Sequence, residues 1–151
     1  MHTAINNSKI DISLKKSTKR LAEDLVNFLK IGDIIFLHGE MGVGKTTFVR
    51  YLINQFQKNN NLAITNVTSP TFNLLNEYQV KDLIIKHYDL FRLKDKSEIE
   101  NLDLFENYKN SLTLIEWPKL IKKEKLINTI DLIFTYEDEF ESRSVKINGL
   151  S

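Results

Sequence analysis

The segment Gly39–Thr46, with the sequence GEMGVGKT, constrains the fold of this chain more strongly than any other feature. It matches the pattern G-x-x-x-x-G-K-[ST] of the phosphate-binding P-loop. Glycines let the backbone wrap closely around an anion, so that successive N–H groups point inward toward phosphate. Lys45 can place a compact positive charge on the terminal phosphates, and the Thr46 hydroxyl can ligate Mg²⁺. The motif predicts phosphate binding by this loop and the start of the next helix: Gly39, Glu40, Met41, Gly42, Val43, Gly44, Lys45, Thr46 and Thr47.

A functional P-loop requires a strand before it and a helix after it, and the sequence predicts both. Ile34–Leu37 is a continuous apolar run, as expected for a buried parallel strand. After the loop, Phe48, Leu52 and Phe56 recur at helical spacing. This context favours a true phosphate site over a chance match to the pattern.

Composition narrows the class of nucleotide-binding protein. Three of the 5 glycines lie in the loop, and the chain has neither the Asp-x-x-Gly and Asn-Lys-x-Asp motifs of small GTPases nor a dinucleotide-binding G-x-G-x-x-G. A net charge of +1 gives no electrostatic case for nucleic-acid or membrane binding over the whole surface. With 151 residues, no cysteine, no signal-peptide pattern and no membrane-length apolar run, we expect a single domain over residues 1–151 that is soluble, cytoplasmic and monomeric in isolation.

Hydrophobic periodicity predicts further elements along the chain. A first helix is expected from an N-cap at Ser17 or Thr18 to about Lys30. The hairpin expected over residues 73–90 would add antiparallel strands to an otherwise parallel sheet. The remaining expected elements are strands over Ile10–Leu14, Leu62–Val67, Leu112–Ile115, Ile130–Tyr136 and Ser142–Ile147, short surface helices within Lys94–Asn110, and a basic helix over Lys119–Lys125.

Two carboxylates are candidates to complete the phosphate site. Asp89 ends the second hairpin arm and could hold Mg²⁺ through water, although this arm is not the usual apolar run. Glu116 follows the strand 112–115. If that strand runs parallel to 34–37, Glu116 lies beside the phosphates, where it could bind Mg²⁺ or position the attacking water. A solvated glutamate at the end of a strand remains the alternative.

Several other residues have both a structural and a functional interpretation. Thr71 lies in a polar turn and is also a candidate switch residue that senses Mg²⁺ or the γ-phosphate. Trp117 is either a core residue or a ring that stacks on a base. We interpret His87 as a packing or hydrogen-bonding residue rather than a ligand, Arg92 as a surface salt-bridge partner rather than a catalytic finger, and Thr18 as a helix cap.

Three short motifs accompany the P-loop: Ser69–Phe72 (SPTF), His87–Leu93 (HYDLFRL) and Glu116–Pro118 (EWP). Each is weak alone, but in this order and at these distances they resemble the TsaE family, formerly YjeE. The likeness runs from about Thr18 to Trp117 and more loosely through the terminal strands. Members are small bacterial ATPases of tRNA threonylcarbamoyladenosine biosynthesis.

The resemblance implies a fold, an activity and partners. The implied fold is α/β, a P-loop NTPase-like three-layer domain with a mixed sheet, in which a parallel core is extended by antiparallel hairpin strands. The implied activity is hydrolysis of ATP to ADP with Mg²⁺, weak in isolation and stimulated by partners. Those partners are TsaB and TsaD, and tRNA is met only through their complex. Hydrolysis would reset the complex between turnovers, whereas TsaD performs the transfer.

The resemblance also implies roles for individual residues. It makes Thr46 and Glu116 ligands of Mg²⁺, Asp89 the Walker-B-like carboxylate that shares in the metal site, and Thr71 part of a nucleotide-sensitive loop. Lys45, Asp89, Glu116 and Thr71 are therefore the candidate catalytic residues. The resemblance adds three candidate nucleotide contacts outside the loop: Thr18, Trp117 and Arg143.

Two other functions remain alternatives. A small-molecule kinase would share the P-loop, but the region 94–110 is short and lacks the arginines of a substrate-binding lid. A binding module would retain its nucleotide unhydrolysed. Phosphate transfer to small alcohols would favour the first, and unhydrolysed ATP in the presence of all partners would favour the second.

Overall fold

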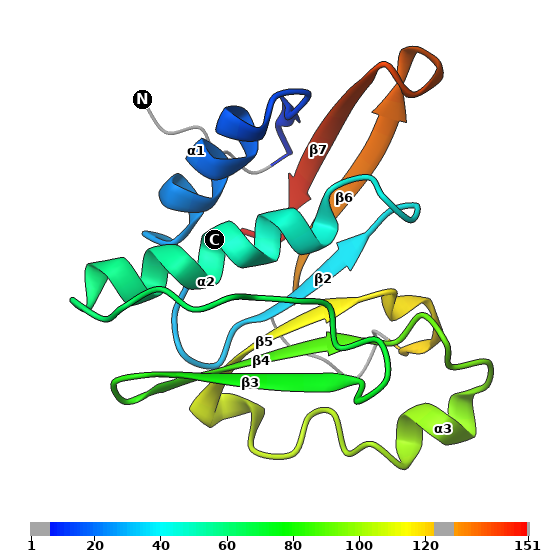
Figure 1. Ribbon diagram of the computed structural model, residues 1–151. Helices are drawn as coiled ribbons and strands as arrows, with labels where there is room; N and C mark the ends of the chain where they lie inside the picture. Colours follow the sequence, from blue (N-terminus) through cyan, green and yellow to red (C-terminus); the bar gives the residue numbers. More distant parts are fainter. Residues whose placement is uncertain (1–6, 123–128, 151) are drawn as a thin grey trace.

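The computed structural model describes residues 7–122 and 129–150. This part of the chain forms one seven-stranded sheet with the order β1-β7-β6-β2-β5-β4-β3 (Figure 1). The strands are β1 (Lys9–Asp11), β2 (Ile34–His38), β3 (Leu75–Val80), β4 (Leu83–Asp89), β5 (Ser111–Glu116), β6 (Thr129–Glu137) and β7 (Ser142–Asn148). The α-helices are α1 (Lys15–Leu25), α2 (Lys45–Asn59) and α3 (Lys96–Glu100), and three 3₁₀ turns cover Tyr108–Asn110, Pro118–Leu120 and Asp138–Phe140.

The sheet is mixed, with a parallel centre and antiparallel strands on both sides. Strand β2 pairs in parallel with β5 and β6, and β4 pairs in parallel with β5. Strands β3 and β7 run antiparallel to β4 and β6, and Lys81 and Asp82 form the turn of the first hairpin. The predicted parallel core with added antiparallel strands is confirmed.

Both faces of the sheet are covered, which gives the predicted three layers. In β2, Ile35 and Leu37 pack in the cluster that includes α1 and α2. Ile34 and Phe36 point to the opposite face and pack with residues of the segment after β4, such as Leu93 and Leu104. This burial on both faces explains why β2 is a continuous apolar run rather than an alternating one.

The strand predicted over Leu62–Val67 does not form; this segment has no regular structure and runs beside α2 (Figure 1). The backbone groups of Thr65, within this segment, bond to side chains of α2 instead of to a neighbouring strand. The Thr65 amide donates to the Gln57 side chain (3.2 Å), and the Asn54 side chain donates to the Thr65 carbonyl (3.1 Å). Leu62 and Ile64 are exposed, so no sheet face gains from pairing this segment.

Two predicted helices differ from the structure, the first in its bounds and the second in its described part as a whole. Helix α1 begins at Lys15 after Leu14 at the N-cap position, and Thr18 is a buried residue inside the helix, so the interpretation of Thr18 as a cap is wrong. The helix ends at Leu25 because the following turns are tighter, with the Phe28 amide bonded to the Leu25 carbonyl (2.9 Å). The basic helix expected over Lys119–Lys125 is wrong in its described part.

In that region the chain makes only a 3₁₀ turn over Pro118–Leu120, and Ile121 is already extended. Residues 123–125 of the expected helix lie outside the described residues. None of the helices within residues 7–122 and 129–150 is long and apolar enough to span a membrane.

Candidate functional site

The candidate site lies where the carboxyl ends of β2, β4 and β5 meet. Leu37 of β2 pairs with Glu116 of β5, and Glu116 pairs in turn with Asp89 of β4. The P-loop follows β2 directly, so both carboxylates lie beside it. Glu116 was expected beside the P-loop if its strand runs parallel to Ile34–Leu37, and this parallel pairing is confirmed. Ligands of open α/β sheets bind at this edge of the sheet.

The P-loop backbone adopts conformations that favour glycine. Gly39 has φ +145°, and a Cβ there would lie only 2.7 Å from the Phe134 carbonyl oxygen. Gly44 has φ +117° but more open surroundings. Between them, Val43 is fully buried in the core and anchors the loop. The loop is therefore shaped by backbone conformation and packing together.

Helix α2 begins at Lys45 without a side-chain hydrogen bond capping its N-terminus. The first amides of a helix point along its axis and carry partial positive charge, so an uncapped N-terminus favours an anion. The Gly44 position that precedes the helix has no side chain to obstruct this approach. These features fit a phosphate group.

Lys45 is almost completely buried, with 4% of its surface exposed. Its ammonium group donates to the Gly39 carbonyl and lies 3.5 Å from the centre of the Trp117 ring. Desolvation lowers the pKa of Lys45 below its ordinary 10.5, and the nearby charges of Glu116 and Asp89 oppose this shift. The site thus holds a desolvated cation beside two carboxylates.

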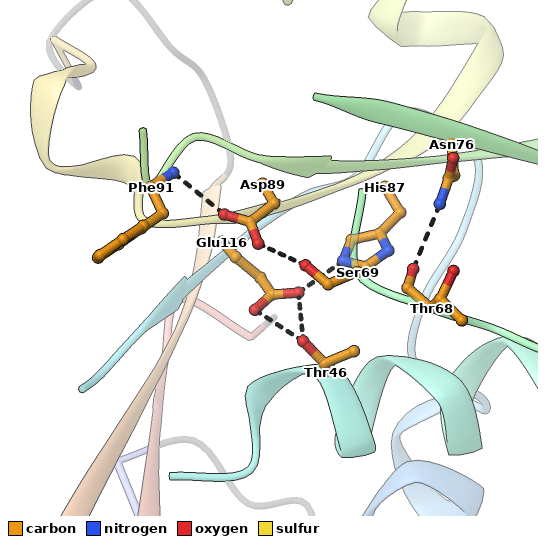
Figure 2. Close-up of polar contacts among 8 residues, drawn as sticks. All are labelled: Thr46, Thr68, Ser69, Asn76, His87, Asp89, Phe91 and Glu116. Carbon is orange, nitrogen blue, oxygen red and sulfur yellow. Dashed lines mark hydrogen bonds and ion pairs between the residues drawn. The ribbon is translucent and has the colours of Figure 1, made fainter. Parts of the chain in front are cut away.

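The Glu116 carboxylate is buried and accepts hydrogen bonds from two sides, as Figure 2 shows. The Thr46 hydroxyl lies 3.1 and 3.0 Å from its two oxygens. On the other side, His87 Nε2 lies 2.6 Å from Oε2. The interpretation of His87 as a hydrogen-bonding residue is confirmed, and the alternative of a solvated Glu116 is wrong because only 2% of this residue is exposed.

Asp89 is the second carboxylate of the site and is also mostly buried. One oxygen accepts from the Ser69 hydroxyl (2.5 Å), and the other accepts from the Phe91 amide (3.0 Å) (Figure 2). The described residues contain no cluster of three or more His, Cys, Asp or Glu that would enclose a metal. A hydroxyl and two carboxylates beside the P-loop nevertheless fit Mg²⁺, which binds few protein ligands and takes others from phosphate and water.

A second loop, residues 68–72, closes the opposite side of the site. The Thr68 carbonyl accepts from Asn76 (3.2 Å), and Ser69 is held by Asp89 (Figure 2). The Arg92 guanidinium donates to the carbonyls of Thr71 (3.2 Å) and Phe72 (2.7 Å). These bonds show that Arg92 holds the 68–72 loop, so its interpretation as a surface salt-bridge partner is wrong.

These groups line one cleft of about 340 Å³, a volume within the range of small-ligand sites. Eleven of the residues predicted for the site are in its wall: Met41, Gly42, Gly44, Lys45, Thr46, Thr47, Thr71, Asp89, Glu116, Trp117 and Arg143. Ser69, Phe91 and Arg92 also line it, although no site role was predicted for Ser69 or Phe91, and Arg92 was interpreted as a surface residue. Their membership of the SPTF and HYDLFRL motifs was the available signal.

Four predicted residues are not part of the cleft wall. Thr18 is buried within α1, and its contact with nucleotide stays a prediction. Val43 points into the core, Glu40 is exposed, and Gly39 contributes its carbonyl to Lys45. For these three loop residues, the backbone is the part that can serve the site.

Trp117 and Arg143 reach the cleft from different sides. Trp117 has φ +61° and packs against Phe91, with 4.8 Å between ring centres. Arg143, on β7, donates from its guanidinium to the Ser13 carbonyl (3.2 Å). A guanidinium nitrogen of Arg143 would lie 3.6 Å from a Cβ at Gly44, so this cation is adjacent to the P-loop.

Comparison with known proteins identifies the family of the chain. The family model described as "Threonylcarbamoyl adenosine biosynthesis protein TsaE" matches residues 12–145. A protein of Rickettsia felis described as "tRNA threonylcarbamoyladenosine biosynthesis protein TsaE" is 45% identical over 108 residues, which are 72% of this chain and 61% of that protein. The chain therefore spans about three fifths of the length of this relative.

A Bacillus subtilis protein with the same description is 36% identical over 110 residues, covering 72% of this chain and 65% of that protein. The crystal structure of Bacillus subtilis YdiB superimposes with a TM-score of 0.68 over 95% of this chain and 86% of that one, and at 23% identity it supports the fold alone. The match to the family model over most of the chain shows that it belongs to the TsaE family, whose members are described as proteins of tRNA threonylcarbamoyladenosine biosynthesis.

Proposed function

We propose that this chain is a Mg²⁺-dependent ATPase and an accessory subunit of the complex that forms N6-threonylcarbamoyladenosine next to the anticodon of tRNAs. One observation carries the proposal. The Lys45 ammonium, the Thr46 hydroxyl and the carboxylates of Asp89 and Glu116 converge on one cleft at the uncapped N-terminus of α2. This set combines cationic, metal-binding and water-orienting groups, which is the combination that phosphoryl transfer requires.

Each group has a role that follows from its position. The P-loop amides and Lys45 would hold the β- and γ-phosphates of ATP. Thr46, Glu116 and Asp89 would hold Mg²⁺, which supplies charge neutralisation on the phosphate oxygens when bound. Asp89 and Glu116 pair across neighbouring strands, and either carboxylate would accept a hydrogen bond from the attacking water.

The remaining cleft residues would contact the nucleotide or respond to it. Phosphate would draw the Lys45 ammonium away from the Trp117 ring, leaving that ring free to stack on the base. Arg143 would add positive charge beside the P-loop. Thr71 faces the same cleft from the 68–72 loop and would sense the γ-phosphate or its metal.

The proposed partners are TsaB and TsaD, and tRNA is contacted only through their complex. ATP hydrolysis would reset that complex between turnovers, and the isolated chain, expected to be monomeric, would hydrolyse ATP slowly. We place this activity in the cytoplasm. The family membership supports the pathway, and the cleft supports the chemistry.

The test is ATP hydrolysis by the purified chain with and without TsaB and TsaD from the same organism. A large stimulation by the partners, abolished in Lys45→Ala, is the expected result. Equal hydrolysis by Lys45→Ala would overturn the site assignment. Phosphate transfer to nucleosides or other small alcohols would indicate a kinase, and ATP retained intact with all partners present would indicate a binding module.

A further inference from the structure

His87 is a fully buried polar residue that does not line the cleft. It lies on β4 opposite Leu114 of β5, and none of its surface is exposed. Its Nε2 atom lies 2.6 Å from Oε2 of Glu116, as Figure 2 shows, and its Nδ1 atom has no hydrogen-bond partner among the described residues. Within the part of the chain that the structure describes, the ring therefore makes a single polar contact, which is to Glu116.

The chemistry of this contact fixes which nitrogen carries the proton. An ionised carboxylate only accepts hydrogen bonds, so Nε2 is the donor. In the neutral ring, Nδ1 is then an acceptor without a donor, which is tolerated better in a protein interior than an unpaired N–H. A buried atom without a partner still lowers stability, so packing alone does not account for an imidazole at this position.

Among the described residues, the Glu116 carboxylate has two side-chain hydrogen-bond donors, and they differ in how ligand binding affects them. Thr46 lies in the cleft wall, and its oxygen would bind Mg²⁺ in the proposed function. His87 approaches from the sheet side and lies outside the cleft wall, so its bond to Glu116 is independent of the ligand. Without His87, only the Thr46 hydroxyl would orient the Glu116 carboxylate, and in the proposed function that hydroxyl binds the metal.

We propose that His87 is a positioning residue that holds the Glu116 carboxylate in the orientation that binds Mg²⁺. This inference rests on the proposed function, because it concerns the metal that accompanies the nucleotide. Carboxylates that bind metals are commonly held by hydrogen bonds from residues behind them, and loss of such a partner lowers metal affinity or activity by roughly 10- to 100-fold.

The test compares His87→Met with His87→Gln, two side chains of similar length of which only glutamine can donate to Glu116. Mg²⁺ is titrated into the chain with ADP, and binding is measured by calorimetry, with ADP binding in EDTA measured separately. We expect His87→Met to raise the half-saturating Mg²⁺ concentration at least about tenfold. His87→Gln should recover most of this loss, and neither should change metal-free ADP binding.

Ile85→Val is the matched control, because Ile85 is buried on the same strand and packs in the core without contacting Glu116. It should leave the Mg²⁺ dependence unchanged. Equal effects of His87→Met and His87→Gln, or no effect of His87→Met, would overturn the positioning role. A native chain whose nucleotide binding ignores Mg²⁺ would instead refute the proposed function and this inference with it.

Imidazole ¹⁵N NMR of the native chain gives a second measurement, which does not depend on whether the His87 variants fold. The proposal requires a proton on Nε2 of His87, retained in the presence and absence of Mg²⁺ and ADP. An Nδ1–H tautomer would contradict it, because Nε2 would then have no proton to donate to Glu116.

Discussion

The two loops that border the cleft are held in place by different means. The P-loop, Gly39–Thr46, is shaped by glycine conformations and by Val43, which is fixed in the core. The 68–72 loop is mostly exposed, with 84% of the Phe72 surface accessible to solvent. Polar contacts to Asp89, Asn76 and Arg92 hold it.

This difference indicates that the P-loop is a fixed element of the cleft. The 68–72 loop is a conditional element, because its position depends on the bond between Ser69 and Asp89. The backbone of the P-loop is set by its glycines and by the buried Val43, none of which is a proposed ligand of Mg²⁺. By contrast, the 68–72 loop is tied to Asp89 through Ser69, and Asp89 is also a proposed ligand of Mg²⁺. Metal binding would therefore compete with the contact that holds this loop.

The largest expected effect comes from removing the cation of the fixed element. Lys45→Met should weaken ADP binding by at least about 2 kcal/mol, roughly thirtyfold, because a charge-assisted contact to phosphate is lost. The chain should still fold, since a buried ammonium is replaced by an apolar group of similar length. Calorimetric titration with ADP and a thermal unfolding curve measure the two effects.

Lys58→Met is the control for this change, because Lys58 is an exposed lysine in the last turn of the same helix. Its ADP affinity should match that of the native chain. Retention of native affinity by Lys45→Met would show that phosphate does not bind at this loop.

The next effect tests whether backbone conformation shapes the P-loop. Gly39→Ala and Gly44→Ala both place a Cβ at positive φ, at a cost of about 1–3 kcal/mol each. Gly39→Ala should be the more destabilising, because its Cβ would also lie 2.7 Å from the Phe134 carbonyl oxygen. Chemical denaturation measures both, and equal losses would mean that the contact with Phe134 is relieved by movement of β6.

The sequence predicted the fixed element better than the conditional one, for physical reasons. The strand β2, the glycine-rich loop and the start of α2 are specified by local residue types, and this order was predicted correctly, whereas phosphate binding stays a prediction. The roles of His87 and Arg92 depend on strand register and on a loop reached through tertiary packing, which no local pattern encodes. The strand expected over Leu62–Val67 failed for the same reason, since side chains of α2 bind its backbone.

A smaller effect concerns the protonation of Lys45. Since desolvation lowers its pKa below 10.5, deprotonation begins at a lower pH than for an exposed lysine. ADP affinity should therefore fall as pH rises toward 10.5, as the protonated fraction falls about tenfold per unit above the pKa. Calorimetric titration across this range measures the effect, and Lys45→Arg, which stays charged, should show no such fall.

The free energy of unfolding should respond to Lys45 in the opposite direction. Between the lowered pKa and 10.5, the unfolded chain binds more protons than the folded chain without nucleotide. The contribution of Lys45 to stability therefore rises with pH in this window, whereas ADP affinity falls. A parallel change of both quantities would contradict the assignment to Lys45.

The smallest expected effect comes from a change in the conditional element, the 68–72 loop. Ser69→Ala removes the hydroxyl that donates a hydrogen bond to Asp89, and it should cost only about 0.5–1.5 kcal/mol of local stability. Hydrogen exchange in the 68–72 loop should quicken while exchange in the P-loop stays unchanged. If Mg²⁺ competes with Ser69 for Asp89, the variant should also bind Mg²⁺–ADP slightly more tightly than the native chain. Weaker binding would show instead that the Ser69 contact orients Asp89 for the metal, so that both loops form one preorganised site.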